Sequence, residues 1–258
     1  MLHPAGEVAA RQKAHLSEIF LWMMIVILPL FLALPFIIWR YRIGGGGRYT
    51  ARWNFSWPLE IVLWGVPLAV VCVLGWNLWH ETAKMDPYAP VGTGDVLRID
   101  AIAYDWKWLF LYREADVASA DRLVLPVGRP VELRLTSATA LQAFSVPRLG
   151  GQIYAMPGMA SRFNLRAEAT GRFEGLNTQY NGAHFARQRF VAEAMTPAAF
   201  EDWIAATGEA PPLDAEALVG LSEPGVLEAP LAFGTVPGDP FQETVTRLMA
   251  GKPLPGDG

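Results

Sequence analysis

The chain has 258 residues, of which 21 are Lys or Arg and 25 are Asp or Glu, so its formal net charge is −4. Hydrophobic residues make up 52% of the chain and charged residues 18%, whereas an average soluble domain is roughly 25% charged. These values exclude a disordered chain and a basic nucleic-acid-binding protein. The one cysteine excludes an internal disulfide, a cysteine-based zinc site and an iron–sulfur cluster.

Two long apolar segments account for the hydrophobic excess. Residues 19–39 carry no charge, and residues 61–79 contain Asn77 as their one strongly polar side chain. A helix over the first segment would be about 31 Å long, which matches the roughly 30 Å hydrocarbon core of a bilayer. We therefore expect transmembrane helices at residues 19–39 and 61–80. A cleaved signal peptide and a pair of buried soluble helices are both disfavoured by the length of these segments.

The distribution of basic residues predicts the orientation of this hairpin. The connection at residues 40–60 has no acidic residue before Glu60 and contains four arginines, Arg40, Arg42, Arg48 and Arg52. The tail at residues 1–18 has no such excess, so the positive-inside rule makes the connection cytoplasmic. Both termini are then periplasmic, and the protein is expected in the inner membrane of a bacterium. The glycine run at residues 43–48 reads as a flexible loop tip and not as a phosphate-binding loop, because no GK[ST] follows.

A β-rich domain is expected after a Pro/Gly linker at residues 86–95. Short runs with alternating apolar residues follow at 96–103, 106–113, 122–127, 130–137, 144–149, 161–168, 171–176 and 188–195. Runs of this length broken by Gly, Pro and Asn indicate a β-sandwich or barrel over residues 96–195. Thr196 and Pro197 then look like an N-cap and a first-turn proline, which predicts a short helix at residues 196–206. We expect a loosely structured tail over residues 207–258, with one short helix near its end.

This organisation and four motifs resemble subunit II of the haem–copper oxidases. The motifs are LEIVLWGVP at 59–67, YDWKWLF at 104–110, AFSVPRLGGQIYAMPGM at 143–159 and GRFEGLNTQYNGAHF at 171–185. The resemblance covers residues 4–206, and the wording of the second and third motifs is most similar to the quinol-oxidising branch. It implies a cupredoxin-like β domain and a place in a proton-translocating respiratory complex that oxidises quinol and reduces O2 to water.

The resemblance also locates a copper centre that this sequence lacks. In the branch that oxidises cytochrome c, a binuclear copper centre (CuA) is held by a C-x-E-x-C-x3-H-x2-M run and by a histidine on an earlier loop. The corresponding positions here are Gln142, Asn177, Gln179, Asn181, Phe185 and Gln188. Amides and a phenyl ring cannot replace bridging thiolates, so we expect no copper and no other cofactor in this chain. His184, one position before a lost ligand, reads as an ordinary loop histidine. The resemblance places the haems and CuB in subunit I.

Glu60 is the residue that we expect to take part in chemistry. It begins the second span at the cytoplasmic side, where a carboxylate near membrane depth is costly and usually functional. In the family, a glutamate seven residues before a proline on this helix lies at the mouth of the K-type proton channel, and Glu60 and Pro67 reproduce that spacing. The alternative is an interfacial carboxylate that stabilises the helix N-terminus.

The implied partners are subunit I and the other subunits of the oxidase, with quinol as substrate of the complex, membrane lipid around the hairpin and no nucleic acid. The chain alone is expected to be non-catalytic. Two alternatives stay open, namely subunit II of a cytochrome c oxidase and a membrane-anchored cupredoxin-like binding or assembly protein. The alternating aromatic residues 106–112 are expected to form a sheet face packed against subunit I, with an electron-entry patch as the alternative. The first residues resemble the region after the lipidated cysteine of family members, so either the start is truncated or this version lacks the lipid anchor.

Overall fold

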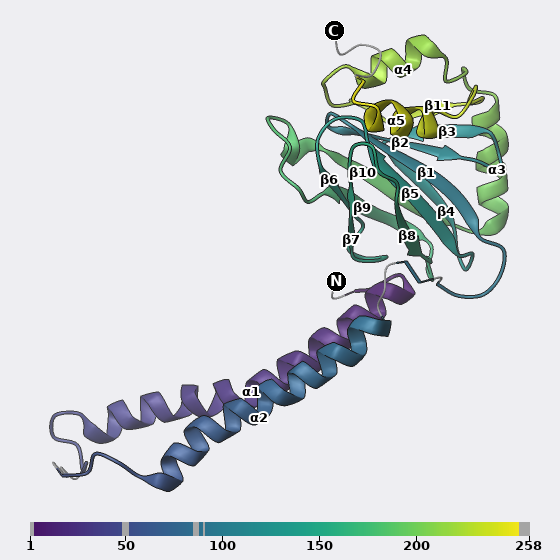
Figure 1. Ribbon diagram of the computed structural model, residues 1–258. Coiled ribbons are helices and arrows are strands. Elements are labelled where there is room, and N and C mark those ends of the chain that lie inside the picture. Colours follow the sequence, from purple (N-terminus) through teal and green to yellow (C-terminus); the bar gives the residue numbers. More distant parts are fainter. Residues whose placement is uncertain (1–2, 48–51, 85–87, 90, 253–258) are drawn as a thin grey trace. The chain divides into compact units, whose positions relative to one another are not determined.

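The computed structural model describes residues 3–47, 52–84, 88–89 and 91–252 (Figure 1). Parts of the predicted connection, linker and tail, namely residues 48–51, 85–87, 90 and 253–258, lie outside the described residues. The chain forms two units: a helical unit of residues 12–86, and a β unit that combines residues 1–11 with residues 87–258. The two units are described separately below.

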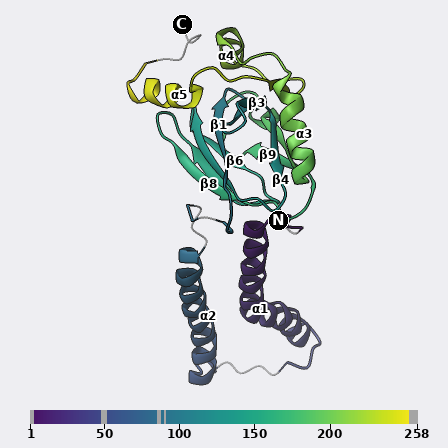
Figure 2. The same cartoon turned by 90° about the vertical axis from the view of Figure 1, so that its right-hand side faces the viewer.

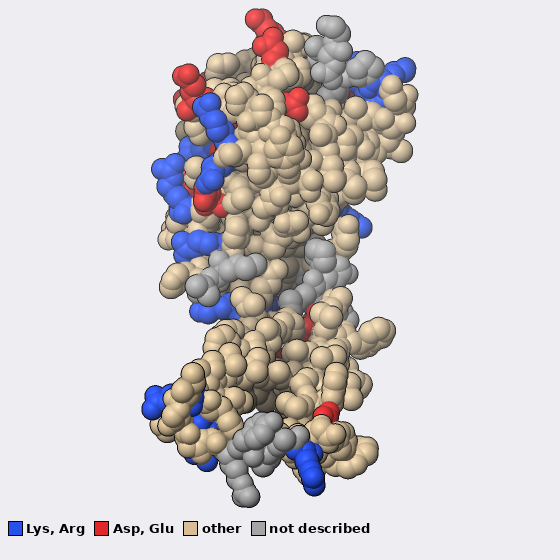
Figure 3. All heavy atoms as spheres, turned by 90° about the vertical axis from the view of Figure 1, so that its left-hand side faces the viewer, with Lys and Arg blue, Asp and Glu red and all other residues tan. Residues whose placement is uncertain are grey.

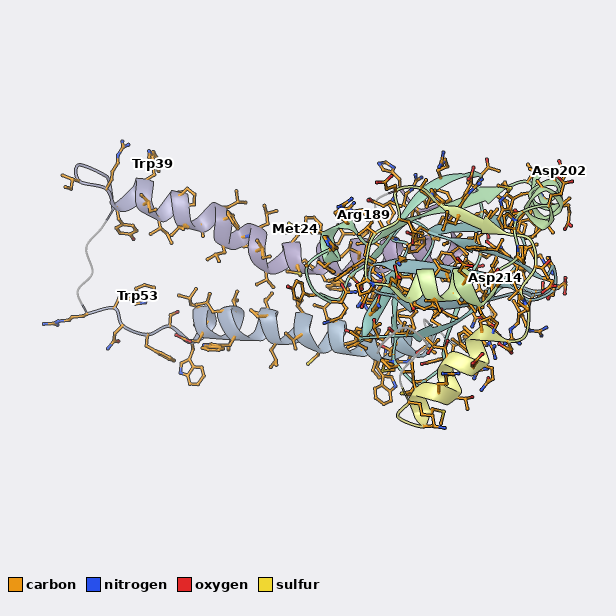
Figure 4. All side chains as sticks on the ribbon, turned by 90° about the horizontal axis from the view of Figure 1, so that it is seen from above. Met24, Trp39, Trp53, Arg189, Asp202 and Asp214 are labelled. Carbon is orange, nitrogen blue, oxygen red and sulfur yellow. The ribbon has the colours of Figure 1, made fainter. Side chains whose placement is uncertain are left out.

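The helical unit is built from α1 (Glu7–Tyr41), most of which belongs to it, and α2 (Trp57–Lys84). Both helices are long and apolar enough to cross a membrane. Their apolar side chains project outward over most of their length, with Trp39 at the end of α1 and Trp53 in the connection (Figure 4). A surface this apolar suits lipid or another membrane protein, not water. The predicted spans at residues 19–39 and 61–80 lie inside these helices.

A side-chain hydrogen bond between described residues joins the two helices of this unit. Asn77, the strongly polar residue of the second span, donates through Nδ2 to Oε1 of Glu18 at 2.9 Å. An amide on a membrane helix needs such a partner, because the hydrocarbon core offers no water. The bond therefore satisfies Asn77 and fixes the register of α1 against α2.

The β unit is a sandwich of two sheets, as predicted. The six-stranded sheet has the order β11-β3-β2-β1-β5-β8 and the five-stranded sheet the order β4-β10-β9-β6-β7. The strands are β1 (Leu97–Tyr104), β2 (Lys107–Tyr112), β3 (Val117–Ala120), β4 (Arg122–Pro126), β5 (Val131–Ser137), β6 (Gln142–Ser145), β7 (Gln152–Ala155), β8 (Ser161–Leu165), β9 (Gly171–Asn177), β10 (Arg189–Met195) and β11 (Leu231–Phe233). The pairs β1–β5 and β4–β10 are parallel, and the other described pairs are antiparallel.

An aromatic core fills the space between the two sheets. Trp108 and Phe110 of β2 meet Phe144 of β6 and Phe190 of β10, with ring centroids 5.1 to 6.5 Å apart. The expectation that residues 106–112 present one face to another subunit is therefore wrong for Trp108, Phe110 and Tyr112, which are buried inside this domain. These side chains do alternate between the two faces of the sheet, as predicted. Because both faces are covered, the alternation does not show which face lies inside the sandwich.

The first described residues complete the β unit. Gly6 forms an antiparallel bridge with Ala167, and the backbone of Ala5 bonds to Arg148 O and to the N–H of Glu168, each at 2.8 Å. A Cβ on Gly6 would lie 2.6 Å from Leu149 O and 2.7 Å from Arg166 O. The segment can approach this closely because residue 6 has no side chain.

The C-terminal part contradicts the expectation of a loosely structured tail. The short helix predicted at residues 196–206 is confirmed as α3 (Pro197–Gly208), capped by the Thr196 side chain. The chain then forms α4 (Ala215–Ser222), β11 and α5 (Pro240–Met249), and α3, α4 and α5 lie along the outside of the sheets (Figure 2). Five buried side chains form a second core with residues of the six-stranded sheet: Leu213, Leu221, Phe233, Phe241 and Val245. The short helix expected near the end of the tail corresponds to α5, whose buried residues recur at helical spacing. The remaining apolar residues of this part are spread over a short helix, a three-residue strand and loops, which is why the sequence did not reveal their order.

Buried charges fasten this C-terminal part to the sheet. Asp100 of β1 is 2% exposed and accepts from Arg134 at 2.7 and 2.9 Å and from Arg113. Arg113 also reaches Asp239, the N-cap of α5, and the Arg134 guanidinium lies 4.6 Å from the Phe241 ring centre. The sheet and α5 are thus joined by one charged network.

A second buried acid makes the stability of the β unit depend on pH. Asp121, with φ 56°, accepts a hydrogen bond from Trp108 N at 2.8 Å, and burial raises the pKa of its carboxyl to about 7. The folded state therefore binds a proton that the unfolded state releases near pH 4, so the free energy of unfolding falls as pH rises from about 4 to about 7.

Asp121→Asn should remove this contribution. Asparagine tolerates a positive φ and keeps an oxygen for Trp108 N, so the variant should unfold with a smaller loss of stability between pH 4 and pH 7. The measurement is denaturant unfolding of the full chain in detergent, followed by far-UV circular dichroism at several pH values. Asp116→Asn is the control, since Asp116 is exposed and also has a positive φ of 53°. An unchanged pH slope in Asp121→Asn would contradict the assignment.

Candidate functional site

Four of the positions that resemble lost copper ligands meet at one end of the β-sandwich. Gln142 begins β6, Asn177 ends β9, and Asn181 and Gln188 lie on the connection between β9 and β10. Gln142, Asn177 and Gln188 are at most 2% exposed. We call these four side chains the amide cluster. The structure therefore brings together four of the six positions that the motif comparison singled out.

Gln188 is the centre of the amide cluster. Its Nε2 donates to Gln142 Oε1 at 2.5 Å, and its Oε1 accepts from Asn177 Nδ2 and from Asn181 Nδ2, both at 2.8 Å. The bonds are neutral and buried, where a lost partner would leave an unsatisfied polar group. The side chain of Gln188 therefore holds the other three amides in place.

The amide cluster also connects the two sheets. Gln142 Nε2 donates to the backbone oxygen of Tyr104, at the end of β1 in the opposite sheet, at 3.0 Å. Asn177 Oδ1 accepts from the backbone N–H groups of Ala143 and Gln179, both at 2.9 Å. The cluster thereby bonds to β1, β6, β9 and the loop after β9, and it closes this end of the sandwich.

The other two predicted positions lie beside the amide cluster. The Gln179 side chain makes no hydrogen bond with the described residues, and its backbone alone takes part. Phe185 packs edge-on against Tyr180, with ring centroids 5.6 Å apart. His184 is exposed, and its ring lies edge-on to Trp106 at 4.9 Å.

These residues do not fit a binuclear copper centre. Copper in such a centre needs soft bridging thiolates with imidazole and thioether ligands, whereas the cluster offers neutral amides. The side-chain oxygens of Gln142, Asn177 and Gln188 already accept hydrogen bonds. Asn181 Oδ1 is the one amide oxygen of the cluster that lacks a partner among the described residues, and a single hard oxygen makes no copper site. Within the described part of the chain, no group of three or more His, Cys, Asp or Glu could hold a metal ion.

Glu60 lies in the helical unit, in the first turn of α2. Its N–H bonds to Ser56 O at 2.9 Å, and its Oε2 accepts a hydrogen bond from Nε1 of Trp64 at 3.0 Å. A carboxylate in the first turn is stabilised by the helix dipole. The position of Glu60 is therefore compatible both with a proton-channel entrance and with a carboxylate that stabilises the helix N-terminus. Sequence reasoning missed Trp64, although a spacing of four residues on a helix was a sufficient signal for the contact.

Comparison with known proteins gives consistent matches. Residues 111–195 match the family described as cytochrome c oxidase subunit II, periplasmic domain. The cytochrome bo(3) ubiquinol oxidase subunit 2 of Pseudomonas putida is 34% identical over 251 residues, which cover 96% of this chain and 80% of that protein. The protein of the same name from Pseudomonas aeruginosa is 32% identical over 250 residues, covering 96% of this chain and 76% of that protein. The crystal structure of the periplasmic domain of subunit II of cytochrome oxidase from Bradyrhizobium japonicum matches 45% of this chain and 95% of its own, with 24% identity and a TM-score of 0.42.

The amide cluster predicts a strong effect of Gln188→Leu on stability. Leucine fills a similar volume but leaves the polar groups of Gln142, Asn177 and Asn181 without this partner. We expect the free energy of unfolding of the β unit to fall by about 2–4 kcal/mol, as for other buried groups that lose their hydrogen bonds. Denaturant unfolding of the full chain in detergent measures this change.

Gln179→Leu is the matched control. Like Gln188, Gln179 is a glutamine at a position that corresponds to a copper ligand in the family. Its side chain makes no hydrogen bond with the described residues. Its effect should stay within about 0.5 kcal/mol. Equal losses in the two variants would show that the hydrogen bonds of Gln188 do not stabilise the domain.

Proposed function

Because the chain belongs to the ubiquinol oxidase subunit 2 family of the haem–copper oxidases, we propose that it is the non-catalytic subunit II of a proton-translocating complex that oxidises quinol and reduces O2 to water. The relatives named ubiquinol oxidase match nearly the whole chain, across both units. The names of these relatives do not support the two alternative functions, a membrane-anchored binding or assembly protein and a subunit of a cytochrome c oxidase.

The amide cluster is the observation that carries the quinol assignment. A soluble cytochrome c gives up electrons at the surface of a complex and needs a redox centre there to receive them. The residues at the copper positions are hydrogen-bonded amides that supply no thiolate, imidazole or thioether. A quinol dissolved in the membrane can reach the haem-bearing subunit directly. In this proposal the β unit has a structural role, and the haems and CuB belong to subunit I.

The helical unit supports a place beside subunit I in the inner membrane. Both helices expose large apolar side chains, including Phe31 at 70% and Leu68 at 65%, which lipid or another membrane subunit would cover. The described arginines of the connection, Arg40, Arg42 and Arg52, follow or precede the apolar stretches of the two helices. Figure 3 shows Lys and Arg side chains at this end of the helical unit as well as on the β unit. The positive-inside rule then puts the connection in the cytoplasm and both termini in the periplasm.

In this orientation Glu60 lies at the cytoplasmic end of α2, where protons would enter the complex. Its carboxylate can take a proton from cytoplasmic water and release it to the next protonatable group or water inside the complex. Such a role gives a reason for the presence of an ionisable residue next to an apolar span. We propose Glu60 as the entrance of this proton path.

The choice of electron donor can be tested on the purified oxidase complex. O2 uptake is measured with ubiquinol and with reduced cytochrome c, each offered separately. Uptake with ubiquinol alone is the expected result. Uptake with reduced cytochrome c would overturn the quinol assignment, and purification of this chain without a haem-bearing subunit would overturn its place in the complex.

Glu60→Gln tests the proton-entry role. The amide keeps the size and a hydrogen-bond acceptor for Trp64 but cannot exchange a proton. The complex should assemble with its haems intact, and steady-state O2 uptake with ubiquinol should fall severalfold. Glu7→Gln is the control, because Glu7 is an acid of the β unit that pairs with Arg11. Wild-type uptake by an assembled Glu60→Gln complex would exclude Glu60 as the entrance.

A further inference from the structure

Trp64 contacts the carboxylate that the proposed function uses. It lies one helical turn after Glu60, so both side chains are on the same face of α2. Its Nε1 donates to Glu60 Oε2 at 3.0 Å, while 75% of the residue is exposed. The indole thus meets Glu60 with its polar edge and leaves its apolar surface for lipid or a neighbouring subunit.

The membrane makes this hydrogen bond more than an incidental contact. The backbone carbonyls of a membrane helix are already bonded within the helix, which leaves side chains, lipid headgroups and interfacial water as acceptors for an indole N–H. Among the residues that the structure describes, Glu60 is the acceptor for Trp64. A phenylalanine would fill the same apolar space and would need no acceptor. The indole therefore gives Glu60 a hydrogen-bond donor that a phenylalanine at this position would not give.

The bond leaves the two carboxylate oxygens in different situations. Oε2 is held by Trp64, whereas no donor among the described residues reaches Oε1. A carboxylate with one fixed oxygen has fewer rotamers, and the other oxygen keeps a constant direction for water. This is the arrangement that a proton-accepting group at a channel entrance needs.

A general role of tryptophan at the membrane interface does not explain the contact. Trp76 packs against the His80 ring at 4.5 Å, and Trp79 is 80% exposed. Neither indole N–H donates to an acid among the described residues, although both tryptophans lie on the same helix. Anchoring at an interface therefore does not require a bond to a carboxylate.

We propose that Trp64 is a positioning residue for Glu60, whose indole N–H holds Oε2 and leaves Oε1 to accept a proton from cytoplasmic water. The proton passes from hydronium to Oε1 and then to the next water or protonatable side chain of the complex, which returns Glu60 to its ionised form. Trp64 keeps its own proton throughout. This inference rests on the proposed role of Glu60 as the proton entrance.

The test is a double-mutant cycle in the assembled oxidase with Trp64→Phe and Glu60→Gln. In the complex with Glu60, Trp64→Phe should lower kcat for ubiquinol oxidation about three- to tenfold, the scale of one typical net hydrogen bond at a solvent-accessible position. The KM for ubiquinol should not change, because quinol binding does not involve this pair. In the Glu60→Gln complex, Trp64→Phe should cause no further loss.

Trp79→Phe serves as the matched control, since it removes an indole from the same helix without touching Glu60, and it should leave kcat unchanged. A normal kcat in Trp64→Phe, while Glu60→Gln is slow, would overturn the role of Trp64 and leave that of Glu60 intact. An equal loss from Trp64→Phe with and without Glu60 would show a structural effect and would also overturn it. Normal turnover in Glu60→Gln itself would instead overturn the proton-entry role.

Discussion

A buried amide must find hydrogen-bond partners, and in the β unit Gln188 supplies them to three others at once. Its bonds to Gln142, Asn177 and Asn181 are neutral, so they stabilise the domain without a metal ion or a charge. Through Gln142 the cluster reaches the backbone of β1 in the opposite sheet. The closure of the sandwich, the course of the loop after β9 and the lack of copper ligands all follow from the same four side chains.

The same requirement applies to the helical unit, whose two helices are long and apolar enough to cross a membrane. Asn77 bonds to Glu18 on the other helix, and Trp64 bonds to Glu60 one turn away. Each pair gives a polar side chain of a membrane helix a hydrogen-bond partner. The two pairs differ in consequence: the first joins two helices, whereas the second constrains a carboxylate within one helix and leaves its second oxygen open.

Features with a strong local signal were predictable from the sequence. The apolar length of the spans, the Thr196 cap with Pro197 and the β-sandwich were anticipated, and motif spacing identified the positions of the amide cluster. The inner face of β2 was not predictable, because both faces of its sheet are covered and the alternation fits either. The order of residues 209–252 was missed for a related reason. It depends on long-range contacts such as Arg113 with Asp239, and on apolar residues that lie on separate short elements. The hydrogen bond from Gln142 to the backbone oxygen of Tyr104 was not predictable either, because every residue has a backbone carbonyl and the sequence does not show which one is used.

The two candidate sites differ in the one property that separates a structural group from a proton carrier. A group that transfers protons needs an ionisable atom with access to water, and Glu60 Oε1 has no donor among the described residues. Gln188 has no ionisable atom, its Oε1 accepts two hydrogen bonds, and it is 1% exposed. The amide cluster can therefore hold the domain together but can carry neither electrons nor protons. Of these two sites, Glu60 on α2 is therefore the one that can contribute to the chemistry of the oxidase, and the β unit has a structural role in the proposed arrangement.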